Sequence, residues 1–98
     1  MLAELTHTHF EPLVGSTFRL RLNAAESLPL VLTQMRVASQ PPAADLRRGF
    51  SLIFGSALPG HVPQHTYTLE HPALGALDLF IVPIGPNADG MQYQAVFG

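Results

Sequence analysis

The chain contains no cysteine and no lysine among its 98 residues. Without cysteine it forms no disulfide, and it offers neither a thiolate ligand for zinc nor a cysteine nucleophile. Without lysine it has no lysine side chain for Schiff-base chemistry. Composition alone therefore excludes several common routes to structural metal binding and covalent catalysis.

Charge is also scarce. Charged residues make up 12% of the chain, about half the usual share for a globular protein, and the formal net charge is −2. All five positive charges are arginines, and seven carboxylates offset them. A protein that binds nucleic acid usually carries a clustered basic excess, which displaces counterions from the phosphates. We therefore expect no nucleic-acid partner.

Long apolar runs are missing as well. No segment approaches the ~20 apolar residues that a membrane-spanning helix needs. The first residues, MLAELTHTHFEP, lack both the basic region and the apolar stretch of a secretory signal. The sequence therefore predicts a soluble protein that is cytoplasmic at synthesis, with no signal peptide, no transmembrane segment and no membrane partner.

The chain does have enough apolar material for one core. Hydrophobic residues make up 47% of it, and its length is that of one domain. We therefore treat residues 1–98 as a single domain. The low share of charged residues leaves little polar surface to cover a monomer, which favours a protein partner.

Apolar and polar residues alternate with a period of two, which is typical of β-strands. Short turn-forming links, such as HPALG and GPNADG, separate several of the strands, while two longer loops span 38–49 and 55–63. The sequence therefore predicts an all-β fold, a small six-stranded, mainly antiparallel barrel or sandwich over residues 17–97. The six predicted strands are 17–22, 28–37, 50–55, 65–70, 75–84 and 91–97.

The N-terminal arm, residues 1–15, is predicted to contain one short helix. Thr8 and Glu11 have the spacing of a capping box. Phe10 and Leu13 lie at helical spacing and give the helix an apolar side. We expect about one and a half turns of helix, which plug one barrel end or cover one sheet face.

Two of the predicted strands are apolar on both faces. In the segment 75–84, one face carries two leucines and an isoleucine, while the other carries Phe80, Val82 and Ile84. A strand that is apolar on both faces must be covered on both. Either the helix and the loops cover the second face, or another protein does, because an exposed apolar patch usually marks a contact surface.

If another protein covers the second face, outward apolar side chains form the interface and a pair of arginines orients it. Each large side chain left in water forgoes roughly 1.5 to 3 kcal/mol of burial. We predict that the interface consists of Val31, Ile53, Phe80, Val82, Val96, Arg19 and Arg21.

Patterns for metal binding are weak. His7 and His9 form an H-x-H pair, and His61 and His65 are the further candidates that would have to complete a site. A metal site needs three or four ligands and groups that support them. We therefore predict no metal site.

Catalytic patterns are weak too. His71 precedes Pro72, and we interpret it as a turn residue whose imidazole bonds to nearby backbone. Glu70 and Asp78 flank the same turn and are predicted to lie opposite each other, exposed to solvent. No serine lies in a G-x-S-x-G elbow, and no glycine-rich phosphate loop is present. The sequence favours a protein without enzymatic activity, and predicts neither catalytic residues nor a cofactor.

Four segments together resemble a family of short bacterial proteins known only as a domain of unknown function: FEPLVGSTFRL, FSLIFG, PQHTYTLEHPALGALDLFIVPIG and MQYQAVF. The resemblance covers nearly the whole chain, and the run that ends in VPIG before a terminal aromatic strand is fairly specific. It brings no catalytic role. Members are often encoded near proteins that resemble phage tail-collar or tail-fibre modules, so the resemblance implies a part in a fibre-like assembly.

Two hypotheses follow. The first is a non-enzymatic structural or protein-interaction module, which contacts copies of itself or a tail-like or fibre-like protein. The second is a small-ligand-binding or enzymatic β-barrel with a pocket near Tyr67 and Tyr93.

Overall fold

The structure, a computed structural model, describes residues 7–37, 49–57 and 62–97. Most of the predicted loop 38–49 and the middle of the loop 55–63 lie outside the described residues, as does the start of the N-terminal arm. None of the described helices is long and apolar enough to cross a membrane.

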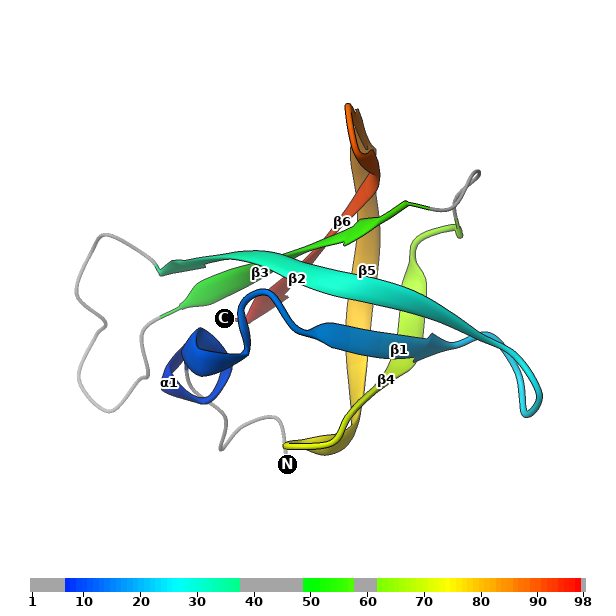
Figure 1. Cartoon of the computed structure of the whole chain (residues 1–98), viewed down its shortest axis with the longest axis horizontal. Coiled ribbons are helices and arrows are strands. Elements are labelled where there is room, and N and C mark those ends of the chain that lie inside the picture. The colour runs from blue at the N-terminus through cyan, green and yellow to red at the C-terminus, as the bar shows by residue number, and fades with distance from the viewer. Residues whose placement is uncertain (1–6, 38–48, 58–61, 98) are drawn as a thin grey trace.

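Six strands form a closed antiparallel barrel in the order β1–β2–β3–β6–β5–β4 (Figure 1). The barrel closes between β1 and β4, where only the pairs Arg19–Glu70 and Leu20–Leu69 are in register. The predicted all-β fold is confirmed, and closure makes it a barrel. The strands are β1 (Thr17–Arg21), β2 (Ser27–Val37), β3 (Phe50–Ser56), β4 (His65–His71), β5 (Gly75–Asn87) and β6 (Gly90–Phe97).

The two long strands, β2 and β5, each change partner halfway along. β2 pairs with β1 up to Val31 and with β3 from there on, and β5 pairs with β4 up to Ile81 and with β6 from Val82. Each strand has a register shift just after the change of partner, at Leu32/Gln34 and at Pro83/Gly85. Such bulges let a strand bend from one sheet into another.

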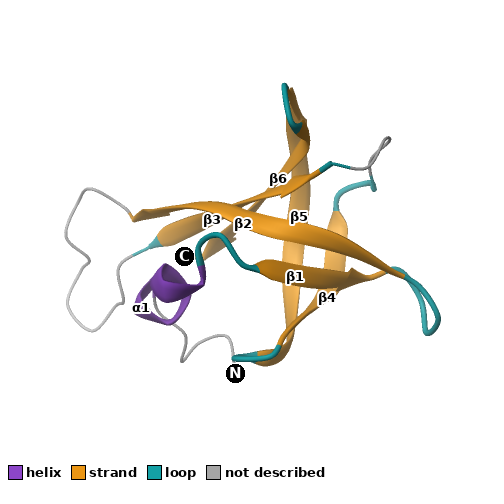
Figure 2. Ribbon diagram, viewed as in Figure 1, coloured by secondary structure: helices purple, strands orange, loops and turns teal. Residues whose placement is uncertain are grey.

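The barrel therefore has two walls. The first wall consists of β1, β4 and the first halves of β2 and β5, and the second consists of β3, β6 and their second halves. Figure 2 shows β2 and β5 running across one another, as expected for strands that turn the corners of a barrel.

One apolar core fills the space between the walls. In β1 the alternation is clear, because Phe18 and Leu20 are fully buried between exposed neighbours. Within the described residues, no buried side-chain nitrogen or oxygen lacks a hydrogen-bond partner. The core consists of Phe10, Phe18, Leu20, Leu30, Leu32, Phe50, Leu52, Phe54, Leu69, Leu79, Ile81, Tyr93, Ala95 and Phe97.

The predicted N-terminal helix is present but divided. An α-helical turn, α1 (His7–Phe10), leads into a 3₁₀ turn, η2 (Glu11–Leu13), so Thr8 lies inside the helix and not at its N-cap. Phe10 is fully buried, and its ring centroid lies 5.7 Å from that of Phe50 and 5.4 Å from that of Phe97. The helix thus plugs the end of the barrel where β3 begins and β6 ends, as the sequence predicts.

Candidate interaction surface

The outer side of the second wall is nearly free of charge. Its outward residues include three glutamines, and its middle row runs Gln34–Ile53–Gln94–Val82 across four strands. Arg36 is the only charged residue among them. We call this surface the glutamine face; it consists of Gln34, Arg36, Ser51, Ile53, Gly55, Val82, Gln92, Gln94 and Val96.

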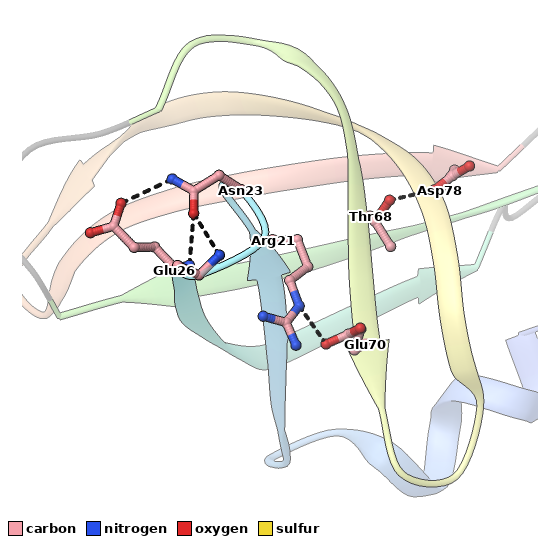
Figure 3. Close-up of polar contacts among 7 residues, drawn as sticks. Arg21, Asn23, Glu26, Thr68, Glu70 and Asp78 are labelled. Atoms are coloured by element: carbon pink, nitrogen blue, oxygen red, sulfur yellow. Dashed lines mark hydrogen bonds and ion pairs between the residues drawn. The ribbon is translucent and has the colours of Figure 1, made fainter.

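The outer side of the first wall is different, because it carries Arg19, Arg21, Glu70 and Asp78. Arg21 Nε donates to Glu70 Oε1 over 2.9 Å, and the hydroxyl of Thr68 donates to Asp78 over 2.7 Å (Figure 3). Both side chains of the ion pair are about two-fifths exposed, so the pair adds little stability. The outer side of the first wall is therefore the more charged of the two, although the exposed Phe80 also lies on it, near the border with the second wall.

The prediction that Glu70 and Asp78 lie opposite each other is wrong. The hairpin places Ala76 opposite Glu70 and Thr68 opposite Asp78. The reason is the turn, in which His71 pairs with Gly75 across a three-residue loop and Gly75 adopts a φ of 76°. This common hairpin geometry shifts the centre of the turn to residue 73.

The two large apolar side chains with the highest exposed fractions among the described residues lie at one corner of the glutamine face. Val96 is 70% exposed and Phe80, on β5 next to the face, is 53% exposed. The pairing of β5 with β6 ends at Val82–Gln94. Phe80 and Val96 are each two residues beyond this last pair, so they flank the point where the two strands diverge. Figure 1 shows the two strands separating there. Val82 between them is half-buried.

The prediction that Ile53 is an exposed interface residue is corrected by its burial. The sequence predicts it as an outward interface residue, and it does lie on the glutamine face, but only 3% of its surface is exposed. It lies in register between Gln34 and Gln94, at the centre of the face. Because it is covered within its own chain, it has almost no surface to offer a partner.

The structure separates the remaining predicted interface residues. Val31 is 37% exposed and lies at the far end of the face from Val96. Arg19 and Arg21 lie on β1, which two strands separate from β6 in either direction around the barrel. The predicted set therefore does not form one patch; Phe80, Val82 and Val96 do come together.

Two hollows lie at opposite ends of the glutamine face. The first, of about 330 Å³, lies over Gly55 and is bordered by Val31, Gln92 and the hairpin residue Asp89. The second, of about 410 Å³, is lined by Arg36 and Val96. We call them the Gly55 hollow and the Arg36 hollow.

A third hollow, of about 500 Å³, lies on the first wall between β1 and the β4–β5 turn. Arg19, Glu70 and His71 line it, so it combines one positive and one negative side chain. The charges of the hollow therefore favour neither an anionic nor a cationic ligand.

His71 joins a hydrogen-bond network that ties the N-terminal segment to the β4–β5 turn. Its Nδ1 accepts the backbone N–H of Ala73 over 3.0 Å, which confirms the predicted bond to nearby backbone. Its Nε2 lies 3.0 Å from Ser16 Oγ, and that hydroxyl donates to the carbonyl of Leu13. The contact with Ser16, 55 residues away in sequence, had no signal in the local pattern.

The network assigns the proton of the neutral imidazole. A backbone N–H can only donate, so Nδ1 carries no proton and Nε2–H donates to Ser16. A serine nucleophile needs the opposite arrangement, in which the imidazole accepts the hydroxyl proton. The geometry of Ser16 and His71 thus serves to hold two segments together.

We expect Ser16→Ala and His71→Phe each to lower the free energy of unfolding by about 1 to 2 kcal/mol, because each leaves a partner without its hydrogen bond. The double variant will lose less than the sum of the two, by about 1 kcal/mol, since the two side chains share one network. Urea unfolding of all four proteins measures the coupling. Strictly additive losses would contradict the shared network.

The two tyrosines named in the pocket hypothesis both bond to one backbone segment. Tyr67 donates to the carbonyl of Pro63 over 2.7 Å, and the hydroxyl of Tyr93 accepts the N–H of Val62 over 3.1 Å. Burial, with a smaller contribution from Tyr93, raises the pKa of Tyr67. Neither tyrosine lines the three hollows described above.

Two of the histidines considered as metal ligands pack against different aromatic rings. His7 lies edge-on to Phe50 at 6.3 Å between ring centroids, and His65 lies edge-on to Tyr67 at 5.4 Å. His61 lies outside the described residues. In the part of the chain that the structure describes, no three acidic or histidine side chains gather in a way that could hold a metal ion.

Fold and surface together define a closed six-stranded antiparallel β-barrel with one wall charged on its outer side and the other almost uncharged. The chain belongs to a family described as a domain of unknown function (DUF6916), whose model matches residues 5–97. No curated protein and no solved structure matches the chain.

Proposed function

We propose that this domain is a non-enzymatic structural or protein-interaction module that binds another protein through the glutamine face and the adjoining Phe80. The observation that carries the proposal is the exposure of Val96 and Phe80 at one corner of a face without acidic residues. Interface centres are depleted in charged residues and enriched in large apolar ones. Exposed apolar side chains that lie together on a surface usually mark a site of protein contact.

The distribution of charge supports this choice of face. The first wall carries two arginines and two carboxylates on its outer side, whereas the glutamine face carries Arg36 alone. Glutamine side chains hydrogen-bond without the desolvation cost of a charge. A partner can therefore cover the glutamine face at low cost, while covering the first wall would bury several charges.

The partner we propose is a second copy of the chain or a component of a tail-like or fibre-like assembly. The family resemblance supports the second of these, because members are often encoded near proteins that resemble phage tail-collar or tail-fibre modules. A structural module in such an assembly would work by contacts of the kind proposed for this face.

A photo-crosslinking amino acid placed at Val96 tests the proposal in the cells from which the gene comes. We expect protein adducts from position 96, because this side chain is the most exposed apolar group of the proposed contact among the described residues. The control carries the same amino acid at Arg19, which is exposed on the opposite wall. Denaturing gels and mass spectrometry of the adducts give the result. Absence of adducts at 96, or equal yields at both positions, contradicts the proposal.

A further inference from the structure

Two charged side chains mark opposite ends of the glutamine face, one on the face itself and one on the hairpin beside it. Arg36 lies near the end of β2 and lines the Arg36 hollow, and Asp89 lies at the tip of the β5–β6 hairpin and lines the Gly55 hollow. Three strand spacings of ~4.8 Å and about six residues of ~3.3 Å separate them, so they lie more than ~20 Å apart. They cannot pair within one chain.

Each of these charges has free bonding capacity. Arg36 Nε donates to Gln34 Oε1 over 3.1 Å, and its terminal nitrogens have no partner among the described residues. The carboxylate of Asp89 has none there either, since only its backbone N–H is used, in a bond to Asn87. Arg36 thus gives the face a positive corner, and Asp89, on the hairpin just beyond the face, places a negative charge beside the opposite corner.

A surface of this kind is complementary to itself. The line from Arg36 to Asp89 is one diagonal of the face. Consider a two-fold axis that lies in the plane of the face and runs along the other diagonal, which crosses this line near its middle. Rotation about it lays the face on that of a second copy and brings the corner of Arg36 over the corner of Asp89, twice. The same rotation places Val96 of each copy near Val82 and Phe80 of the other. Strands of the two copies then cross at a steep angle, which is one of the two common ways for sheets to pack.

We propose that the glutamine face binds a second copy of this chain about this two-fold axis, with Arg36 of each copy paired to Asp89 of the other and Val96 packed against Phe80 and Val82. The inference rests on the proposed function and specifies its partner. A two-fold interface uses the same patch on both copies, so both the charge pair and the apolar contact form twice. The face spans roughly 15 by 20 Å, from three strand spacings and six residues. This is well below the roughly 800 Å² per partner of a typical stable complex, so we expect a dissociation constant in the micromolar range.

Charge reversal provides the test. We expect R36E and D89R each to weaken dimerisation at least tenfold, because each places two pairs of like charges across the interface. An equimolar mixture of the two variants will dimerise again as a heterodimer. At one corner the glutamate introduced at position 36 then faces the arginine introduced at position 89, and at the other corner the native Arg36 faces the native Asp89. Sedimentation equilibrium from ten to several hundred micromolar gives the affinities, and native mass spectrometry identifies the mixed species, because the variants differ in mass.

R19E is the matched control, because Arg19 is also exposed and has no partner among the described residues, but lies on the first wall. It will leave the dimer unchanged. Circular dichroism establishes that each variant is folded, and R36Q replaces R36E if the latter is not, with a smaller loss of affinity expected.

Three results would overturn the inference: a wild-type chain that stays monomeric at the highest concentration, a dimer that R36E does not weaken, or two weakened variants whose mixture does not recover. None of them would by itself remove the proposed function. If position 96 crosslinks to other proteins while the purified chain is monomeric, the glutamine face is a contact surface and the second copy is not its partner.

Discussion

Replacing Gly90 with alanine will lower the free energy of unfolding by about 3 kcal/mol or more. Gly90 pairs with Asn87 to close the two-residue β5–β6 hairpin, and its φ is 132°, which side chains with a Cβ rarely adopt. A Cβ built there would lie 2.0 Å from the carbonyl oxygen of Ser56 and 3.0 Å from its carbonyl carbon. Both are backbone atoms of β3, so the strands must separate to admit the methyl group.

The variant Gly85→Ala separates the cost of the positive φ from the cost of the clash with the backbone of β3. Gly85 also has a positive φ, 111°, but a Cβ there would meet nothing within 4 Å. We expect this variant to lose only the conformational term, about 1 to 2 kcal/mol. Urea unfolding followed by circular dichroism measures both. Equal losses in the two variants would show that strain in the chain, and not the approach of β3, fixes glycine at position 90.

If the proposed dimer forms, the replacement of Gly90 also affects dimerisation. Asp89 immediately precedes Gly90 and borders the Gly55 hollow, at the point where the hairpin packs closely on β3. A folded Gly90→Ala chain would therefore place its carboxylate differently. Close packing of the backbone at this point connects the stability of the barrel to the shape of its contact surface.

The strands were predictable because their cause is local. Alternation in TFRLR places Phe18 and Leu20 in the core whatever the rest of the chain does, and the Asp89–Gly90 pair marks a turn by its own backbone preferences. The exchange of partners by β2 and β5 was not predictable in this way. It depends on the bulges beside Leu32 and Pro83, which exist because the sheet must bend to close.

Closure has equally little local signal. Only two residue pairs join β1 to β4, and the residues involved resemble any others in alternating strands. The charge segregation also depends on closure, since it appears only when the strand order places Arg21 and Glu70 on one wall and the three glutamines on the other. The sequence therefore predicts the existence of an apolar outer surface but not its position or its boundary.

Ile53 shows where the period-two pattern is insufficient, because it predicts the face of a strand and not the depth of a side chain on it. Ile53 and Val96 lie on the same face of neighbouring strands, yet Ile53 is 3% exposed and Val96 is 70% exposed. Long neighbours on both sides of Ile53, Gln34 and Gln94, lie in register with it. Val96 follows the end of the β5–β6 pairing and has no strand on that side.

Ile53→Asp will therefore lower the free energy of unfolding by about 4 kcal/mol or more, since it removes the burial of a large side chain and places a carboxylate where water is excluded. Much of a small domain's total stability is then lost, and we expect the chain to be largely unfolded at 37 °C. Val96→Asp will change the free energy of unfolding by about 0.5 kcal/mol or less. Denaturant unfolding at a protein concentration at least tenfold below the dissociation constant, where the proposed dimer is dissociated, compares the two.

Ile53→Val controls for the position itself, and we expect it to cost about 1 kcal/mol. Association then distinguishes the roles of the two residues, because Val96→Asp leaves a folded chain that no longer dimerises, whereas Ile53→Val leaves dimerisation intact. If Ile53→Asp were folded and merely monomeric, Ile53 would be an interface residue after all, as its place in the alternation predicts. If Val96→Asp unfolded the barrel, the exposed corner of the glutamine face would belong to the core, and the proposed contact would lose its main apolar group.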